Sequence, residues 1–236
     1  MSVRPHWPFP AVSLPRPPHG IVGAPHAGAP HADALRAASR HTAVWISRIA
    51  CPPVVALVLL ARVIDGSPVP RAWAWAAMFA LPAVVTPALV VAALVRAGRV
   101  VDFDLSDRRQ RHLPFAVATL CAVVSTAVLA NLGGPATLVA FGVAWSALLA
   151  LLCAVTLRWK ISLHGAAAGA AAGMSITAGG AMAGTSGAVG ADIALWLALP
   201  LAVGWARVVL RRHTPRQVVA GTAVGVAAIV LASLPY

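Results

Sequence analysis

Three short polar clusters interrupt an otherwise apolar chain, and each contains residue types that phosphate chemistry uses. The clusters are residues 102–112, 158–164 and 207–217, and every one of them includes arginine and histidine. Guanidinium groups bind phosphoryl oxygens in bidentate geometry and stay charged at any relevant pH. Imidazole can attack phosphorus or carry a proton to a leaving group. Together the clusters predict a site for a phosphorylated ligand.

Apolar stretches separate the clusters in pairs, two between the first and second and two between the second and third. A membrane-spanning helix needs about 20 mostly apolar residues, so we expect an all-α, polytopic membrane helix bundle with six or seven such helices. The candidate spans are residues 44–64, 72–95, 115–132, 136–157, 165–184, 189–208 and 217–234. Because an even number of crossings returns the chain to the same membrane face, all three clusters can meet there.

The composition excludes a soluble globule, since 60% of the residues are hydrophobic and only 10% are charged. The bilayer is therefore the expected surroundings of the chain. Its net charge of +12 lies in loops between apolar stretches, which favours contact with anionic lipid headgroups over binding to nucleic acid. The three cysteines lie within expected spans without metal-site or disulfide spacing, so we expect them to serve in packing.

The composition of the N-terminal segment predicts the domain organisation, and the basic residues predict the orientation in the membrane. Residues 1–42 are rich in Pro, His, Ala and Gly without apolar periodicity, which predicts a disordered cytoplasmic tail before a transmembrane domain of residues 43–236. Every Lys and Arg except Arg62 and Arg71 falls on the face that carries the clusters. The positive-inside rule places that face in the cytoplasm. The excess of Ala, Arg, Gly and Pro is typical of GC-rich bacteria, so we expect a bacterial inner (plasma) membrane.

The expected span at 165–184 has an unusual pattern of small residues. Gly165, Gly169 and Gly173 recur every four residues and form one smooth stripe on a helix. Such a stripe lets a second helix approach closely, so it predicts packing rather than a ligand-binding loop.

The third cluster resembles the third signature of the type-2 phosphatidic acid phosphatase superfamily. That signature consists of Ser-Arg, five residues, His, three residues and Asp. Arg207 and His213 match in place, whereas Ala206 and Gln217 stand where the family has Ser and Asp. A carboxylate beside the histidine would fix its tautomer and stabilise the imidazolium, whereas an amide orients the ring without supplying charge.

The other two clusters resemble the remaining signatures of the same superfamily, in the same order. Ser162 and His164 align with the Pro-Ser-Gly-His element. In the first signature, which runs Lys, six residues, Arg, Pro, Arg111 takes the Arg position. Asp104 stands at the Lys position and His112 at the Pro position. The resemblance covers roughly residues 44–234.

The resemblance implies a membrane hydrolase that needs no cofactor and releases phosphate from a polyprenyl or diacylglycerol phosphate or diphosphate. It implies that His213 is the nucleophile that forms a phosphohistidine, with Gln217 beside it. His164 would be the acid that protonates the leaving oxygen. The residues expected to bind the phosphate oxygens are Arg111, Arg207, Ser162, Lys160 and Arg108.

Two other functions remain open at the level of sequence. The sequence also leaves the oligomeric state and the identity of the lipid undetermined. Asp102, Asp104 and Asp107 could bind Mg²⁺ beside the arginines, as in enzymes that ionise a prenyl diphosphate, such as prenyltransferases and terpene cyclases. These aspartates could equally pair with the adjacent arginines and keep the loop ordered. The changes at Asp104 and Gln217 also fit a non-catalytic lipid-phosphate binder or small transporter.

Overall fold

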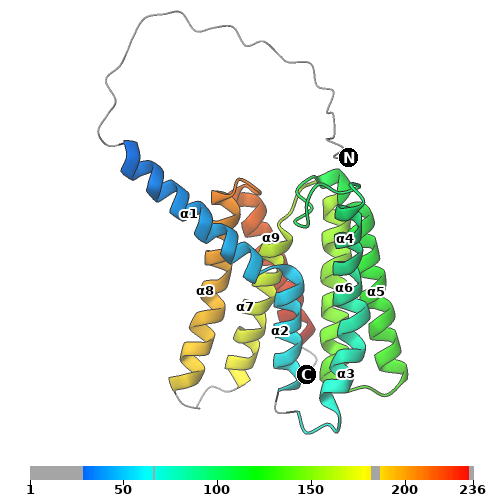
Figure 1. Cartoon of the computed structure of the whole chain (residues 1–236). Coiled ribbons are helices and arrows are strands. Elements are labelled where there is room, and N and C mark those ends of the chain that lie inside the picture. Colours follow the sequence, from blue (N-terminus) through cyan, green and yellow to red (C-terminus); the bar gives the residue numbers. More distant parts are fainter. Residues whose placement is uncertain (1–28, 66, 182–186, 234–236) are drawn as a thin grey trace, which may run out of the picture.

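The computed structural model describes residues 29–65, 67–181 and 187–233, and the regular structure in these ranges is helical (Figure 1). The all-α prediction is therefore confirmed for the described chain. The helices are α1 (Ala29–Ile49), α2 (Pro52–Ile64), α3 (Ala72–Ala80), the π-helical turn η1 (Leu81–Val85), α4 (Thr86–Arg96), the 3₁₀ turn η2 (Arg108–Gln110), α5 (His112–Asn131), α6 (Ala136–Thr156), α7 (Leu163–Ala181), α8 (Gly187–Val209) and α9 (Pro215–Ser233).

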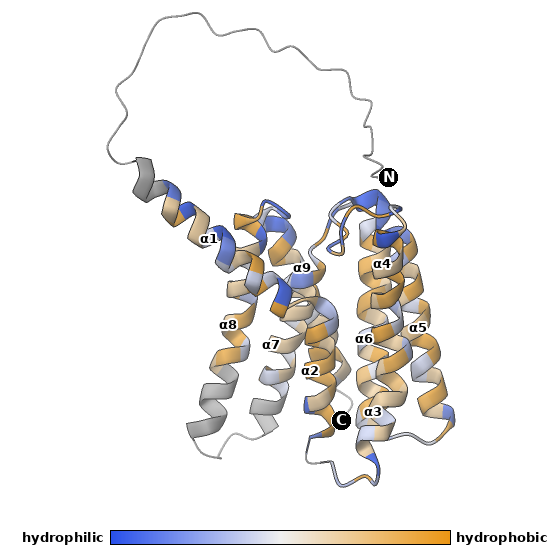
Figure 2. Ribbon diagram, in the orientation of Figure 1, coloured by the Kyte–Doolittle hydropathy of each residue, from blue (hydrophilic) through white to orange (hydrophobic). Residues whose placement is uncertain are grey.

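Several helices are long and apolar enough to cross a membrane. There are four such segments in the described chain, and the bent pair Asp33–Ile49 and Pro52–Ile64 makes a fifth if it counts as one span. Figure 2 shows the bundle helices mainly in apolar colours, with polar residues concentrated in the loops at the upper end of the view. Among the described residues, α7 and α8 do not add further candidates. The four segments are Ala72–Arg96, Arg108–Asn131, Ala136–Thr156 and Pro215–Ser233.

The first helix begins within the segment that was expected to be a disordered tail. Residues 29–42 are helical and belong to α1, whereas the sequence pattern placed them in a disordered tail; residues 1–28 lie outside the described chain. The segment is rich in Ala and also contains Leu35, Arg36 and Arg40, all good helix formers. Pro30 falls in the first turn, where the missing N–H group costs nothing. A composition rich in Pro, His, Ala and Gly therefore did not exclude a helix in residues 29–42.

Prolines explain two irregularities within the expected spans. The span predicted at 44–64 is broken between α1 and α2, and the two helices meet at a bend of 50°. Pro52 and Pro53 lack N–H donors and restrict the preceding residue, so the helix cannot continue through them. Pro82 lies in the π-helical turn η1, and Pro87 is the second residue of α4, which follows that turn. A π-helical turn is a usual response to proline within a long helix.

The central helix α7 packs most extensively against α9 and also contacts α8 and α2. Its glycine stripe of Gly165, Gly169 and Gly173 faces α9, where a Cβ added at Gly169 would collide with the carbonyl oxygen of Thr222. The predicted close approach is confirmed, and α9 is the partner helix. The two backbones lie nearly in contact because α9 contributes two glycines of its own, Gly221 and Gly225.

Candidate active site

Three loops at the same end of the bundle carry the polar clusters (Figure 1). They are residues 97–111 between α4 and α5, 157–162 between α6 and α7, and 210–214 between α8 and α9. Hydrogen bonds cross from loop to loop: Arg111 Nη1 donates to the Ile161 carbonyl at 2.8 Å, and the Ser162 amide donates to the Gln217 carbonyl at 3.2 Å. The structure thus brings the three clusters together, as the even number of intervening helices predicts.

The turn after α8 places His213 directly against Arg207. Arg211 adopts a left-handed conformation with φ of 54°, and the amides of Arg212 and His213 both donate to the Arg207 carbonyl, at 3.0 and 3.3 Å. The bond from Arg212 is the six-to-one hydrogen bond of a Schellman-type helix end. The left-handed position of this motif, here Arg211, is usually occupied by glycine. A non-glycine residue at this position costs about 1 kcal/mol. The local sequence therefore folds the chain back so that His213 returns to the end of α8, close enough for the charge of Arg207 to act on its ring.

Gln217 orients the His213 ring through a capping box at the start of α9. The Gln217 amide donates to Thr214 Oγ1 at 3.4 Å, and the Thr214 amide donates back to Gln217 Oε1 at 3.1 Å. The same Oε1 lies 3.2 Å from His213 Nδ1. Because Oε1 can only accept, Nδ1 must carry the proton, which leaves Nε2 of a neutral ring with its lone pair free. Gln217 thus fixes the tautomer and supplies no charge.

The surroundings of His213 favour the neutral ring. Burial lowers its pKa to about 3, helped by the positive charges of Arg111, Arg207 and Lys160, while the hydrogen bond with Gln217 acts weakly in the opposite direction. Because the pKa of His213 is lowered far below its ordinary value, the imidazole is neutral around pH 7. This protonation state is the one that a nucleophile requires.

We therefore expect His213 to show no titration between about pH 5 and pH 8. The measurement is the carbon chemical shift of isotope-labelled histidine by NMR on the protein in detergent, with the resonance identified by its loss in His213→Gln. A midpoint within that interval would mean that the ring is solvated, in conflict with its buried place beside two guanidinium groups.

His164 lies at the start of α7, where Ser162 caps the helix. Ser162 is fully buried and its Oγ accepts a hydrogen bond from the Gly165 amide at 3.1 Å. His164 is also buried and hydrogen-bonds the backbone of Ser47. Its Nε2 has no hydrogen-bond partner in the described structure and lies 3.8 Å from Asp104 Oδ1, beyond hydrogen-bonding distance. The free nitrogen is therefore available to a ligand.

Arg207 is buried at the end of α8 and is held by two oxygens. Its Nη1 donates to Asp104 Oδ2 at 2.7 Å and to Ser47 Oγ at 3.3 Å, while its Nε has no partner in the described structure. Burial acts to raise the pKa of Asp104, but Arg207, His164 and Arg212 together lower it below the ordinary value. The carboxylate is therefore charged at neutral pH.

Arg111 links the first and second clusters. It is buried, its Nε donates to the Leu105 carbonyl at 2.7 Å, and its Nη1 donates to the Ile161 carbonyl at 2.8 Å. The guanidinium also lies 5.9 Å from the centre of the Phe115 ring. Arg111 thus holds two loops together in addition to lining the cavity described below.

The other expected phosphate ligands are placed differently. Arg108 is turned away from the cavity and donates to the Leu157 carbonyl at 2.7 Å, so it supports the end of α6 and does not bind phosphate in this arrangement. Ser162 uses its hydroxyl as a helix cap and does not line the cavity. Lys160 is partly buried outside the cavity lining, close enough for its charge to act on His213. Spacing alone could not show these competing partners.

Each of the three aspartates considered for Mg²⁺ has a partner of its own in the structure. Asp102 pairs with Arg212, Asp104 pairs with Arg207, and Asp107 caps the turn η2 through the Arg109 amide. In the described part of the chain, no group of three His, Cys, Asp or Glu side chains lies close enough to bind a metal ion. The expectation that these aspartates pair with the adjacent arginines is wrong in its partners, because Asp102 and Asp104 both pair with arginines of the third cluster and Asp107, among the described residues, accepts only from a backbone amide.

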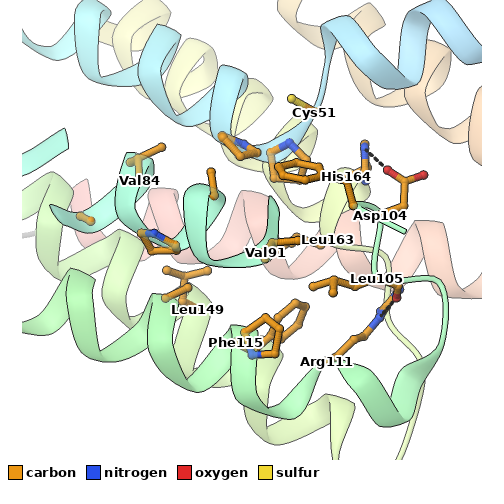
Figure 3. A pocket seen from close by; sticks show the side chains of 18 of the residues that line it. Cys51, Val84, Val91, Asp104, Leu105, Arg111, Phe115, Leu149, Leu163 and His164 are labelled. Atoms are coloured by element: carbon orange, nitrogen blue, oxygen red, sulfur yellow. Dashed lines mark hydrogen bonds and ion pairs between the residues drawn. The ribbon is translucent and has the colours of Figure 1, made fainter. Parts of the chain in front are cut away.

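A cavity of about 100 Å³ connects the polar cluster to the interior of the bundle. Asp104, Arg111, His164 and His213 line it together with apolar side chains of α2, α4, α5 and α6. Figure 3 shows Asp104, His164 and Arg111 at one end, with apolar side chains continuing from there along the helices. This apolar lining was not predicted from the spacing of residues, and it includes Val84, Pro87, Val91, Phe115, Trp145 and Leu149.

The sequence also missed Ser47, which contacts both His164 and Arg207. A single serine at the start of an apolar stretch carries no signal of its own, and the packing of α1 against α8 brings it to Arg207. The completed arrangement has two imidazoles, Asp104 and the buried guanidinium of Arg111 around one cavity, with the buried guanidinium of Arg207 bound to Asp104 beside it. Such a set can bind an anion and transfer a proton. Comparison of the chain with protein-family models, with curated proteins and with solved structures finds no match.

Proposed function

We propose that this protein is a membrane lipid phosphatase that releases phosphate from a polyprenyl or diacylglycerol type of phosphate or diphosphate. One observation carries the proposal most strongly. His164 Nε2 and Arg207 Nε are both buried without a hydrogen-bond partner in the described structure, on either side of the Asp104 carboxylate. Buried polar groups are nearly always satisfied, so two free nitrogens in one cluster point to a missing anionic ligand.

The proposed reaction assigns a separate role to each imidazole. His213 Nε2 attacks phosphorus with its lone pair, and the bond between phosphorus and the lipid oxygen breaks. The leaving oxygen takes a proton from His164 Nε2, which gives a phosphohistidine and a free lipid alcohol, or a lipid phosphate when the substrate is a diphosphate. Water then attacks phosphorus, gives its proton to His164 and releases orthophosphate from His213.

The charges around the cavity suit this reaction. Arg111 and Arg207 supply fixed positive charge where the transferring phosphoryl group would carry negative charge. A bound phosphate also favours protonation of His164, because it places negative charge next to the ring. Gln217 keeps Nε2 of His213 free for attack but does not stabilise the imidazolium by charge. We therefore expect a slower enzyme than one with a carboxylate at this position.

The lipid part of the substrate is supported by the cavity and by the membrane setting. Apolar side chains continue from the polar end of the cavity into the bundle (Figure 3), so a hydrocarbon chain attached to the phosphate would be buried there. In this proposal the chain crosses the membrane seven times, through α1–α2, α3–α4, α5, α6, α7, α8 and α9. It places the cluster at the cytoplasmic face of a bacterial inner membrane, in keeping with the basic residues of the loops.

Purified protein in detergent should release inorganic phosphate from polyprenyl phosphate, polyprenyl diphosphate or phosphatidic acid, and excess EDTA should not reduce the rate. The reason is that the proposed chemistry uses imidazole and guanidinium groups and no metal ion. Colorimetric phosphate measurement over a series of protein concentrations checks this. Tight binding of these lipids with no phosphate released over many hours would overturn the enzyme proposal and leave a lipid-phosphate binder. Strict dependence on Mg²⁺ would overturn the mechanism.

A further inference from the structure

Asp104 lies where an incoming phosphate would have to bind. Its Oδ2 accepts a hydrogen bond from Arg207 Nη1 at 2.7 Å, and its Oδ1 lies 3.8 Å from His164 Nε2. Arg207 and His164 are two of the groups that the proposed reaction assigns to the phosphate and its leaving oxygen. The carboxylate therefore occupies binding groups in the free protein that a phosphate would need.

The loop around Asp104 holds the carboxylate in this position from both sides. Before it, Asp102 accepts from Arg212 Nη1 at 2.9 Å and from the Ser106 amide at 3.0 Å. After it, Leu105 has a left-handed φ of 51°, and its carbonyl is bound by Arg111 Nε. The Asp104 side chain itself remains 27% exposed. The backbone is thus fixed while the carboxylate has a path towards solvent.

A purely structural ion pair would explain part of this geometry, because a buried guanidinium such as Arg207 needs a counterion. It does not explain why Asp104 lines the cavity beside His213 and Arg111. Nor does it explain the imidazole of His164, whose nearest carboxylate oxygen stops short of hydrogen-bonding distance. An anion site with a carboxylate standing in it accounts for both features.

We propose that Asp104 is a built-in competitor for the anion site, so that it limits the affinity for phosphate by occupying Arg207 until a ligand displaces it. The inference rests on the proposed function in taking phosphate as the ligand. Displacement breaks a short hydrogen bond between two charged groups, and any carboxylate that stays in place repels the ligand. The phosphatase superfamily has a lysine at the position of Asp104. A lysine there would attract the phosphate, whereas Asp104 weakens its binding.

The test compares Asp104→Asn with Asp107→Asn in the full chain purified in detergent, with orthophosphate and orthovanadate as probes in isothermal titration calorimetry. Asp104→Asn keeps the shape and one acceptor oxygen for Arg207 but removes the charge. It should lower the dissociation constants of vanadate and phosphate by about tenfold or more. A tenfold change is the size of effect by which a neighbouring charge shifts an equilibrium that corresponds to one pKa unit. Asp107→Asn removes the same charge from an exposed part of the same loop and preserves the cap on η2, so it should change the affinity by less than about twofold.

Unchanged or weaker binding by Asp104→Asn would overturn the inference, as would absence of vanadate binding to both the wild type and this variant. Asp104→Ser provides a second variant should the amide impair folding, and it should tighten binding in the same way. The result is separate from that of the phosphatase assay. Tighter vanadate binding by a protein that hydrolyses none of the lipids would sustain the role of Asp104 while defeating the proposed activity.

Discussion

Replacing His213 with alanine is expected to lower phosphate release from a lipid phosphate by about a thousandfold or more, because the variant has no group that can form the covalent intermediate. The structure supports a large effect for this residue. His213 is buried, and its backbone amide is bound to the Arg207 carbonyl. Gln217 orients the ring, and the capping box keeps the Gln217 oxygen next to Nδ1, so that Nδ1 carries the proton of the neutral ring. The measurement is the initial rate of phosphate release under saturating lipid.

The matched control is His112→Ala. His112 is also a histidine of the polar clusters, but it is exposed at the start of α5 and does not line the cavity. It should retain nearly the full rate. Wild-type protein quenched during turnover of labelled substrate should also carry acid-labile phosphate, and His213→Ala should carry none. Activity of His213→Ala above about a tenth of the wild-type rate would remove this residue from the covalent step.

Most of the fold could be predicted because apolar length is a strong signal in a membrane chain. The ends of α5, α6 and α9 lie within a few residues of the expected spans. The break between α1 and α2 was not predicted, although Pro52 and Pro53 stand at the point where it occurs. A long apolar stretch hides such a break, because the mean hydropathy of a window of about 20 residues does not register one or two prolines within it.

The candidate site was predictable to the extent that its residues belong to recognisable patterns. Arg207 and His213, six positions apart, are joined by the turn after α8, and both are buried in the cluster. Spacing could not reveal whether a polar side chain is already used by the backbone, as Ser162 and Arg108 are. It also could not show that Asp104 pairs with an arginine 103 positions away, since adjacent arginines offered a simpler interpretation.

Gly225→Ala is expected to destabilise the protein by about 3 kcal/mol or more and to abolish the candidate site with it. A Cβ at this position would collide with the carbonyl oxygen of Ala166 on α7, which is backbone and cannot rotate away. The helices would have to separate, and in a bilayer their association depends on this close packing. Since α7 carries His164 and α9 carries Gln217, separation would also move the two imidazoles apart.

Gly204→Ala on α8 is the control for this substitution, because its added Cβ would meet only a methyl group of the Val218 side chain, at 3.0 Å. That side chain can shift by a few tenths of an ångström, so we expect a loss of less than about 1 kcal/mol. Thermal unfolding in detergent, followed by tryptophan fluorescence, compares the two variants. Equal melting temperatures for Gly225→Ala and Gly204→Ala would mean that the α7 and α9 backbones do not lie in contact. The close packing of the glycines on α7 and α9 would then not be what holds the three polar loops over one cavity.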